Sequence, residues 1–385
     1  MRRSLLLAVV IGLLSISNTK AQTVVLKKFI NKFDSYKSIS YTSVINNEMP
    51  WGDENGVVQV YQGKSPSGKL QFEEVTDREK TIFDGENLLV MYLQNKYYQL
   101  KNNYKLENDE VGGSKKLFRL SNMATKALNR PEKVKMLPDT IINKTGCYHI
   151  HVIVSDTLRH QKRVYNINDL YISKNSFLPV YFVNTRQVLI GQGDVESNDP
   201  VILVQRNKYL NYSFNKPEIL NTAAVKIPAG YITSEEFNNK PSEKKLPLLT
   251  SGTKAPDWKL QDTKGKYLSN KNLKEKVVLI DFYGQGCAPC IMTEPIMARL
   301  HEKYKNTSVN IISVCIDKDK ASAVTLSKKS KYPVYMKGKD MYNDFHGNAI
   351  PTFYLIDKQG IISKTYVGYD DELEQTLIAE IDKIK

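Results

Sequence analysis

Gly286-Cys287-Ala288-Pro289-Cys290 places two cysteines three residues apart, between a segment typical of a strand and a segment typical of a helix. The preceding run, residues 277–283, is apolar and rich in β-branched side chains, which favours a fully buried strand. From residue 290 to residue 305 apolar side chains recur at every fourth position, as Met292, Ile296, Leu300 and Tyr304. This spacing predicts a helix that packs back on the strand, with both thiols at the turn between them.

The start of a helix favours a negatively charged sulfur. The first N–H groups have no partner within the helix, and the helix dipole is positive at this end, so a thiol there has a lowered pKa. Cys287 lies at this position, and Cys290 lies further into the helix. We therefore expect Cys287 to attack a disulfide and Cys290 to resolve the mixed disulfide that results.

Residues 250–385 resemble the secreted TlpA-like thiol-disulfide oxidoreductases of the thioredoxin superfamily. The likeness rests on the cysteine pair, on the first strand and hairpin at 253–266, and on residues 347–357, which resemble the segment that carries the family's cis-proline. It implies an α/β thioredoxin-like domain. It also implies that Ile350 and Pro351 form the edge on which the substrate chain docks.

Asp281 lies six residues before Cys287, at the position of the buried acid of thioredoxins. The resemblance implies that this carboxyl, raised in pKa by desolvation, exchanges a proton with Cys290. The alternative is an aspartate that only makes hydrogen bonds at the strand end. TlpA-like reductases often carry a glutamate three residues after the second cysteine, but Thr293 stands there, and we expect the next residue, Glu294, to lie at the surface.

The N-terminus predicts export. Arg2 and Arg3 precede a ten-residue apolar core at 5–14, and small residues follow, so residues 1–21 are expected to be a signal peptide cleaved after Ala21. An uncleaved anchor is the alternative. Four cysteines in 385 residues are too few for a disulfide framework, so we expect redox chemistry from the close pair. The predicted location is periplasmic or otherwise exported, and soluble after cleavage.

The length and the 41% hydrophobic content suffice for two domains. A charged, proline-interrupted run at 235–252 predicts a linker between a domain at 22–234 and the thioredoxin-like domain at 253–385. The net charge of +14 would suit nucleic acid. The lysines are spread over both halves, however, so we expect solvated faces and no nucleic-acid partner.

The N-terminal domain is expected to be α+β. Apolar residues at helical spacing over 24–36 predict a first helix, and short β-rich runs separated by turns at 65–68 and 84–85 predict an antiparallel sheet or open barrel. Three runs resemble the LolA-like lipoprotein-carrier fold, at 83–87, 169–180 and 209–214. That resemblance implies an open half-barrel with helices and an apolar ligand in its groove. The alternative is that the many tyrosines only pack within the sheet.

Cys147, His149 and His151 alternate along one expected strand and would share a sheet face. Such ligands suit zinc or copper. Side chains two apart on a strand are spread out, however, and no further ligand is placed by the sequence. We therefore expect ordinary side chains there, and neither a metal nor a cofactor in the protein.

Two other interpretations of the Cys287 and Cys290 pair are disfavoured. A zinc half-site requires a second close pair, and the other two cysteines, Cys147 and Cys315, are isolated; we expect Cys315 to be buried and inert. A peroxiredoxin requires a proline and a threonine or serine before the attacking cysteine, and the corresponding residues are Ile280 and Gly284.

The sequence therefore predicts an exported thiol-disulfide oxidoreductase. The resemblance implies that it reduces disulfide-containing protein substrates and receives electrons from a membrane or periplasmic thiol donor. The alternative is a binding module for a lipid, lipoprotein or peptide, with an accessory thioredoxin-like domain.

Overall fold

A computed structural model of the chain describes residues 21–50, 54–65, 67–106, 116–192, 195–196, 200–216, 226–239, 246–284, 286–317, 321–330 and 332–385. The apolar core of the predicted signal peptide, at 5–14, lies outside these residues. Within them, no helix combines the length and the apolar character needed to cross a membrane.

The chain divides into two compact units. The first unit comprises residues 1–47, 54–187 and 203–240, and the second comprises residues 48–53, 188–202 and 241–385. The second unit therefore contains the predicted redox domain together with two short segments from earlier in the chain. Each unit is described below by itself.

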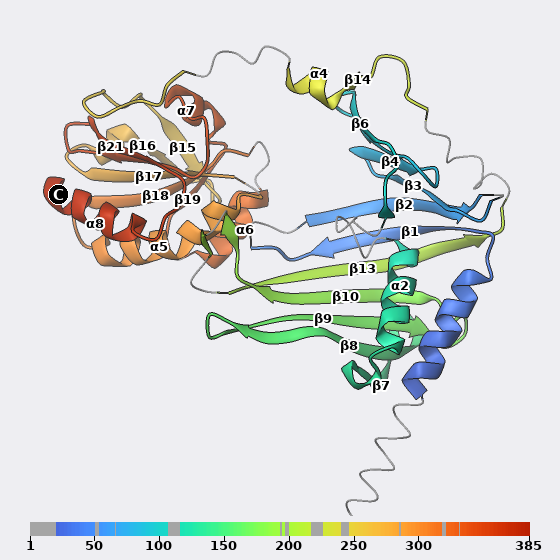
Figure 1. Cartoon of the computed structure of the whole chain (residues 1–385). Coiled ribbons are helices and arrows are strands. Elements are labelled where there is room, and N and C mark those ends of the chain that lie inside the picture. Colours follow the sequence, from blue (N-terminus) through green and yellow to red (C-terminus); the bar gives the residue numbers. More distant parts are fainter. Residues whose placement is uncertain are drawn as a thin grey trace, which may run out of the picture. The chain divides into compact units, whose positions relative to one another are not determined.

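The first unit is mainly a β-sheet (Figure 1). Among the described residues, twelve strands pair in the order β14-β6-β5-β4-β3-β2-β1-β13-β10-β9-β8-β7. The pair of β14 with β6 is parallel. Neighbouring strands from β6 to β13 and from β10 to β7 are antiparallel. The strands are β1 (Ser38–Asn47), β2 (Glu54–Lys64), β3 (Leu70–Val75), β4 (Glu79–Phe83), β5 (Leu88–Tyr92), β6 (Tyr97–Lys101), β7 (Val134–Ile142), β8 (Thr145–Arg159), β9 (Lys162–Ser173), β10 (Pro179–Val188), β13 (Val201–Phe214) and β14 (Ile232–Thr233).

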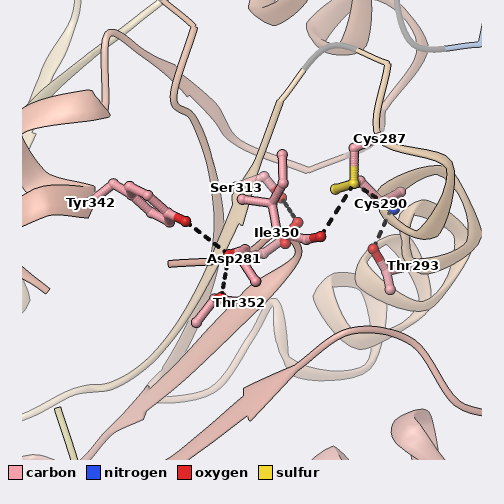
Figure 2. The surroundings of a disulfide bond; sticks show 9 residues. Asp281, Cys287, Cys290, Thr293, Ser313, Tyr342, Ile350 and Thr352 are labelled. Carbon is pink, nitrogen blue, oxygen red and sulfur yellow. Dashed lines mark hydrogen bonds between the residues drawn. A yellow bond between two sulfur atoms is a disulfide. The ribbon is translucent and has the colours of Figure 1, made fainter. Parts of the chain in front are cut away.

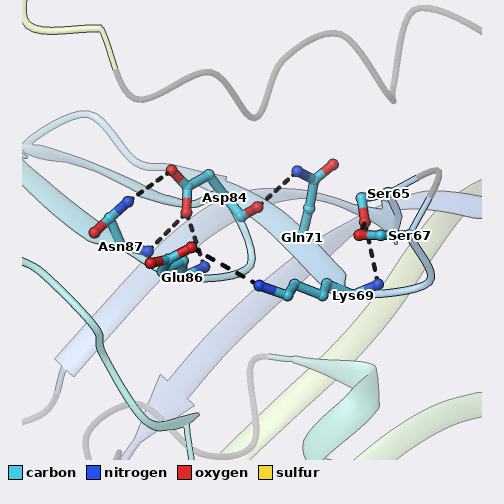
Figure 3. Close-up of polar contacts among 7 residues, drawn as sticks. All are labelled: Ser65, Ser67, Lys69, Gln71, Asp84, Glu86 and Asn87. Atoms are coloured by element: carbon cyan, nitrogen blue, oxygen red, sulfur yellow. Dashed lines mark hydrogen bonds and ion pairs between the residues drawn. The ribbon is translucent and has the colours of Figure 1, made fainter.

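Tight polar turns reverse the chain between these strands, as the sequence predicts (Figure 3). Between β4 and β5 the carboxylate of Asp84 accepts hydrogen bonds from the backbone N–H groups of Glu86 and Asn87, at 2.9 and 2.7 Å. Between β2 and β3 the Ser65 hydroxyl accepts from the N–H of Lys69 at 3.1 Å. Because a short turn joins strands that are antiparallel neighbours, these bonds account for the meander of β2 to β6.

Two helices lie across the same face of this sheet (Figure 1). They are residues 21–34 and α2 (Leu117–Leu128), and the first confirms the helix predicted near 24–36. Apolar side chains of both helices pack with the sheet residues Ile150 and Leu170 in one buried cluster. The unit is therefore mainly sheet with helices, while the half-barrel of the LolA-like resemblance stays a prediction. A short helix, α4 (Ser234–Asn238), occupies the start of the predicted linker.

The second unit is built on a seven-stranded sheet among the described residues, in the order β16-β15-β19-β18-β17-β20-β21. Strands β17, β18 and β19 are parallel to one another. Strand β20 is antiparallel to β17, and β21 is antiparallel to β20. The larger elements are β15 (Lys259–Asp262), β16 (Tyr267–Ser269), β17 (Val277–Tyr283), α5 (Ala288–Tyr304), β18 (Val309–Cys315), α6 (Ala321–Lys329), β19 (Val334–Met336), α7 (Lys339–Asp344), β20 (Thr352–Ile356), β21 (Ile362–Val367) and α8 (Leu373–Ile384).

Every residue of β17 is buried, as the apolar run at 277–283 predicts. The reason is that both faces of the sheet are covered. Leu279 packs in the cluster that includes Leu300 of α5, and its neighbour Ile280 packs on the opposite side in the cluster that includes Phe345. The side chain of Asp281 therefore points to the same face as Leu279, the face covered by α5.

We predict that Leu300→Ala destabilises the protein by about 2–5 kcal/mol, because it removes a fully buried side chain from the contact between α5 and the sheet. Urea denaturation followed by circular dichroism measures the change. Leu246→Ala is the matched control, since Leu246 is 57% exposed, and it should change the free energy of unfolding by less than about 0.5 kcal/mol. Equal effects of the two variants would contradict the packing described here.

Candidate active site

The two cysteines lie at the junction between β17 and α5 (Figure 2). Cys287 is the residue that caps the N-terminus of α5, and its sulfur accepts a hydrogen bond from the N–H of Cys290 at 3.2 Å. Pro289 occupies the first turn of the helix, where its missing N–H costs no hydrogen bond. Cys287 and Cys290 are joined by a disulfide, and Cys287 is the more exposed of the two.

The predicted docking edge lies against this disulfide. The peptide bond between Ile350 and Pro351 is cis, and the carbonyl oxygen of Ile350 lies 3.6 Å from the sulfur of Cys287 (Figure 2). The approach depends on a glycine, because a Cβ at Gly284 would lie 3.0 Å from the side chain of Ile350. The hydroxyl of Thr352 donates to the carbonyl of Ala349 at 2.6 Å and fixes the start of the loop.

Asp281 lies beneath α5 and is 3% exposed. The register of β17 and β18 places Ser313 opposite Asp281, and the Ser313 hydroxyl donates to its Oδ2 at 2.7 Å. The other carboxylate oxygen is buried with no hydrogen-bond partner among the described residues. Burial raises the pKa of Asp281 to about 7, against the opposing effect of the Ser313 bond. At neutral pH this carboxyl is therefore poised to take up or release a proton.

A cavity of about 20 Å³ connects these groups. It is lined by Asp281, Cys287 and Cys290, together with Glu294 and Pro50 among others. Such a volume is large enough for about one water molecule. Asp281 and the two cysteines thus line one small, partly open pocket.

The expectation that Glu294 lies at the surface is wrong. Its side chain is half-buried and lines the cavity beside the thiols. The signal was present in the sequence, because residues four apart on a helix lie on the same face, and Glu294 follows Cys290 by four. Pro50 carried no such signal, since nothing in the sequence relates it to residues far along the chain.

Cys315 is fully buried, as expected. Burial raises the pKa of its thiol to about 12, so that it stays neutral at physiological pH. A nucleophilic cysteine needs an accessible thiol with a lowered pKa, and Cys315 has neither property.

Cys147, His149 and His151 do not come together as a ligand set. Cys147 is buried and its thiol donates to the carbonyl of Thr145 at 3.3 Å. The two imidazoles lie 2.8 and 2.9 Å from one carboxylate oxygen of Asp169, which the neighbouring strand β9 supplies. Within the described ranges no group of three such side chains is arranged to hold a metal ion.

Comparison with known proteins bears on the second unit. Residues 251–365 match the AhpC/TSA family. The chain is 32% identical over 136 residues to the thiol-disulfide oxidoreductase ResA of Bacillus cereus, an alignment that covers 34% of this chain and 78% of that protein. The chain belongs to the thiol-disulfide oxidoreductases.

A second relative and one solved structure are also similar to the oxidoreductase. ResA of Bacillus subtilis is 28% identical over 123 residues, which cover 31% of this chain and 69% of that protein. Among solved structures, the thioredoxin domain of a thiol-disulfide oxidoreductase from Bacteroides vulgatus is 25% identical and has a TM-score of 0.32, covering 34% of this chain and 99% of that chain. All of these matches span about a third of the oxidoreductase.

We predict a pH dependence of stability that comes from Asp281. Between pH 3.8 and about 7 the native state keeps a proton that the unfolded chain has released, so the free energy of unfolding falls as pH rises through this range and levels off above it. The Asp281→Asn variant has no such titrating group. Its free energy of unfolding should therefore exceed that of the wild type by a few kcal/mol at pH 8, but not at pH 3.5. Urea denaturation across this pH range tests the difference.

Ser313→Ala provides a second measurement of the same effect. The Ser313 hydroxyl stabilises the charged form of Asp281, so its removal should raise the pKa of Asp281 further. The fall in stability should then continue to higher pH than in the wild type. Parallel pH profiles for wild type and Asp281→Asn would contradict the assignment.

Proposed function

We propose that the oxidoreductase is an exported reductase of protein disulfides that works through Cys287 and Cys290. The observation that carries the proposal is the placement of the Cys287 sulfur at the helix start, 3.2 Å from the N–H of Cys290 and 3.6 Å from the carbonyl of Ile350. The N–H and the helix dipole favour a thiolate on residue 287. The backbone at Ile350 and Pro351 would pair with an extended substrate chain beside that sulfur.

The reaction begins from the dithiol form of the enzyme. The thiolate of Cys287 attacks one sulfur of a substrate disulfide, a mixed disulfide forms, and the other substrate sulfur leaves as a thiolate that takes up a proton. Cys290 then attacks the sulfur of Cys287, and the second substrate thiol is released. The substrate gains two electrons and two protons, and the enzyme is left with the Cys287–Cys290 disulfide.

Asp281 accepts the proton that Cys290 loses before its attack. The carboxyl is suited to this step because its pKa is raised to about 7 and it shares the small cavity with both sulfur atoms. A membrane or periplasmic thiol donor then returns the enzyme to the dithiol form. Export is proposed from the predicted signal at 1–21, and the mass of the mature protein tests cleavage after Ala21.

Cys287→Ser should abolish insulin reduction with dithiothreitol as the electron source, because serine provides no thiolate to attack the disulfide. Turbidity of the precipitating insulin chains measures the rate. Cys315→Ser is the matched control: that thiol is buried and its pKa is raised, so activity should persist. Activity retained by Cys287→Ser would refute the assignment of the nucleophile.

Asp281→Asn should slow the release of substrate from the mixed disulfide by at least about tenfold at pH 7, because the amide cannot accept the proton of Cys290. Stopped-flow measurement of the second step in single turnover resolves this effect from the attack by Cys287, whose rate should change less. An equal slowing of both steps would point to a disturbed fold rather than to proton transfer.

The role of the first unit is proposed separately. The LolA-like resemblance suggests an apolar ligand between sheet and helices, and this alternative makes the unit a binding module for a lipid, lipoprotein or peptide. The face that the helices cover is filled by buried side chains, among them Phe29, Leu117 and Ile150. Ligand binding would therefore require these helices to move, and mass analysis of material extracted from the purified protein tests for a bound ligand.

A further inference from the structure

A cluster of large apolar side chains lies at the start of α5, close in sequence to the two cysteines, and its central members are buried. Ile291 and Met292 directly follow Cys290 on α5 and are only 9% and 5% exposed. Ile190, itself 9% exposed, packs with both of them. Half-buried side chains complete this cluster, and they are Val188, Val201, Ala288 and Tyr369.

The covering residues come from the segment 188–202, which belongs to the second unit. Within it, β11 (Gly191–Gln192) pairs with β12 (Val195–Glu196) as a short antiparallel hairpin. Ile190 immediately precedes the hairpin. The hairpin thus follows directly on Ile190, a side chain of the cluster that does not come from residues 253–385.

The cluster reaches the docking edge as well as the disulfide. Tyr369, one of its members, follows Gly368, and the N–H of Gly368 donates to the carbonyl of Pro351 at 2.8 Å. On its other side the cluster includes Ala288, the residue after Cys287. The cluster that contains Ile190 thus includes the residue that follows Cys287 and the residue that follows Gly368, which is bound to Pro351.

A second short segment of the same unit approaches the thiols independently. Pro50, from residues 48–53, lines the cavity that holds Cys287 and Cys290, and the preceding residue, Met49, is 4% exposed. Two segments from earlier in the chain thus belong to the second unit, and Pro50 of one of them lines the pocket with the cysteine pair.

We infer that Val188, Ile190 and Val201 form a specificity wall beside Cys287. An apolar patch next to a reactive thiol would otherwise accept the broad surface of a bulky client, because such patches are typical docking surfaces. With the wall in place, access favours clients whose disulfide lies in a slender, extended segment that fits along the Ile350–Pro351 edge. The inference rests on the proposed reductase function and names the class of substrate for it.

Accessibility of Cys287 tests the wall without relying on turnover. In the full-length Cys290→Ser protein the remaining cysteines, Cys147 and Cys315, are buried. The rate of alkylation of Cys287 is measured with N-ethylmaleimide and with a maleimide carrying a 5-kDa polyethylene glycol chain. Adding Ile190→Ala should raise the ratio of the bulky to the small reagent's rate by about threefold or more.

Ile202→Ala is the matched control. Ile202 is an isoleucine of the same segment but is 53% exposed and outside the cluster, so the ratio should not change. An unchanged ratio in Ile190→Ala would overturn the inference. If Ile190→Ala is unfolded by circular dichroism, Ile190→Val and Val201→Ala give the same readout with smaller changes in volume.

Catalysis then tests the substrate class. In proteins that retain Cys290, Ile190→Ala should raise the rate with insulin relative to the rate with oxidised glutathione, whereas Ile202→Ala should not. A fall in this ratio would mean that Ile190 binds clients instead of excluding them, and would overturn the inference. If the wild type reduced neither insulin nor oxidised glutathione, the proposed function would be refuted. The alkylation result would still test the wall, because it does not depend on turnover.

Discussion

The chemistry of this protein depends on one short contact, the hydrogen bond from the N–H of Cys290 to the sulfur of Cys287. It exists because the cysteines are separated by one turn of helix and the first of them caps that helix. A negative charge on the capping sulfur is stabilised by the N–H and by the helix dipole, whereas the same charge on Cys290, further into the helix and buried, is not. This difference supports the proposed roles of Cys287 as the attacking thiol and Cys290 as the resolving thiol.

The rest of the second unit surrounds that contact and includes Asp281, the proposed proton acceptor. Strand β17 is buried on both faces, and this burial raises the pKa of Asp281. A single feature, the complete covering of the central strand, thus contributes both to stability and to the chemistry of the site. Because the carboxyl of Asp281 is buried, the free energy of unfolding falls as pH rises toward neutrality.

The second unit is not one continuous piece of chain. Residues 48–53 supply Pro50, which lines the pocket with the cysteines, and residues 188–202 supply Ile190, which packs with the start of α5. The AhpC/TSA family match, in contrast, covers residues 251–365. The proposed catalytic groups belong to this matched part. The residues of the proposed specificity wall come from the segment 188–202, which lies outside the matched residues 251–365.

The sequence by itself determined the local features: the strand at 277–283, the helix after it, the tight turns of the first unit, and the positions of Cys287, Cys290, Asp281 and the Ile350–Pro351 bond. These follow from periodicity and from motifs whose members are close together, and the family resemblance added the cis bond. Only the tertiary structure decided that Glu294 and Pro50 share a cavity with the thiols, that Asp169 holds two histidines, and that Ile190 covers the start of α5. The physical reason is that such contacts join residues far apart in the chain, and periodicity reports which face of an element is buried but not what buries it.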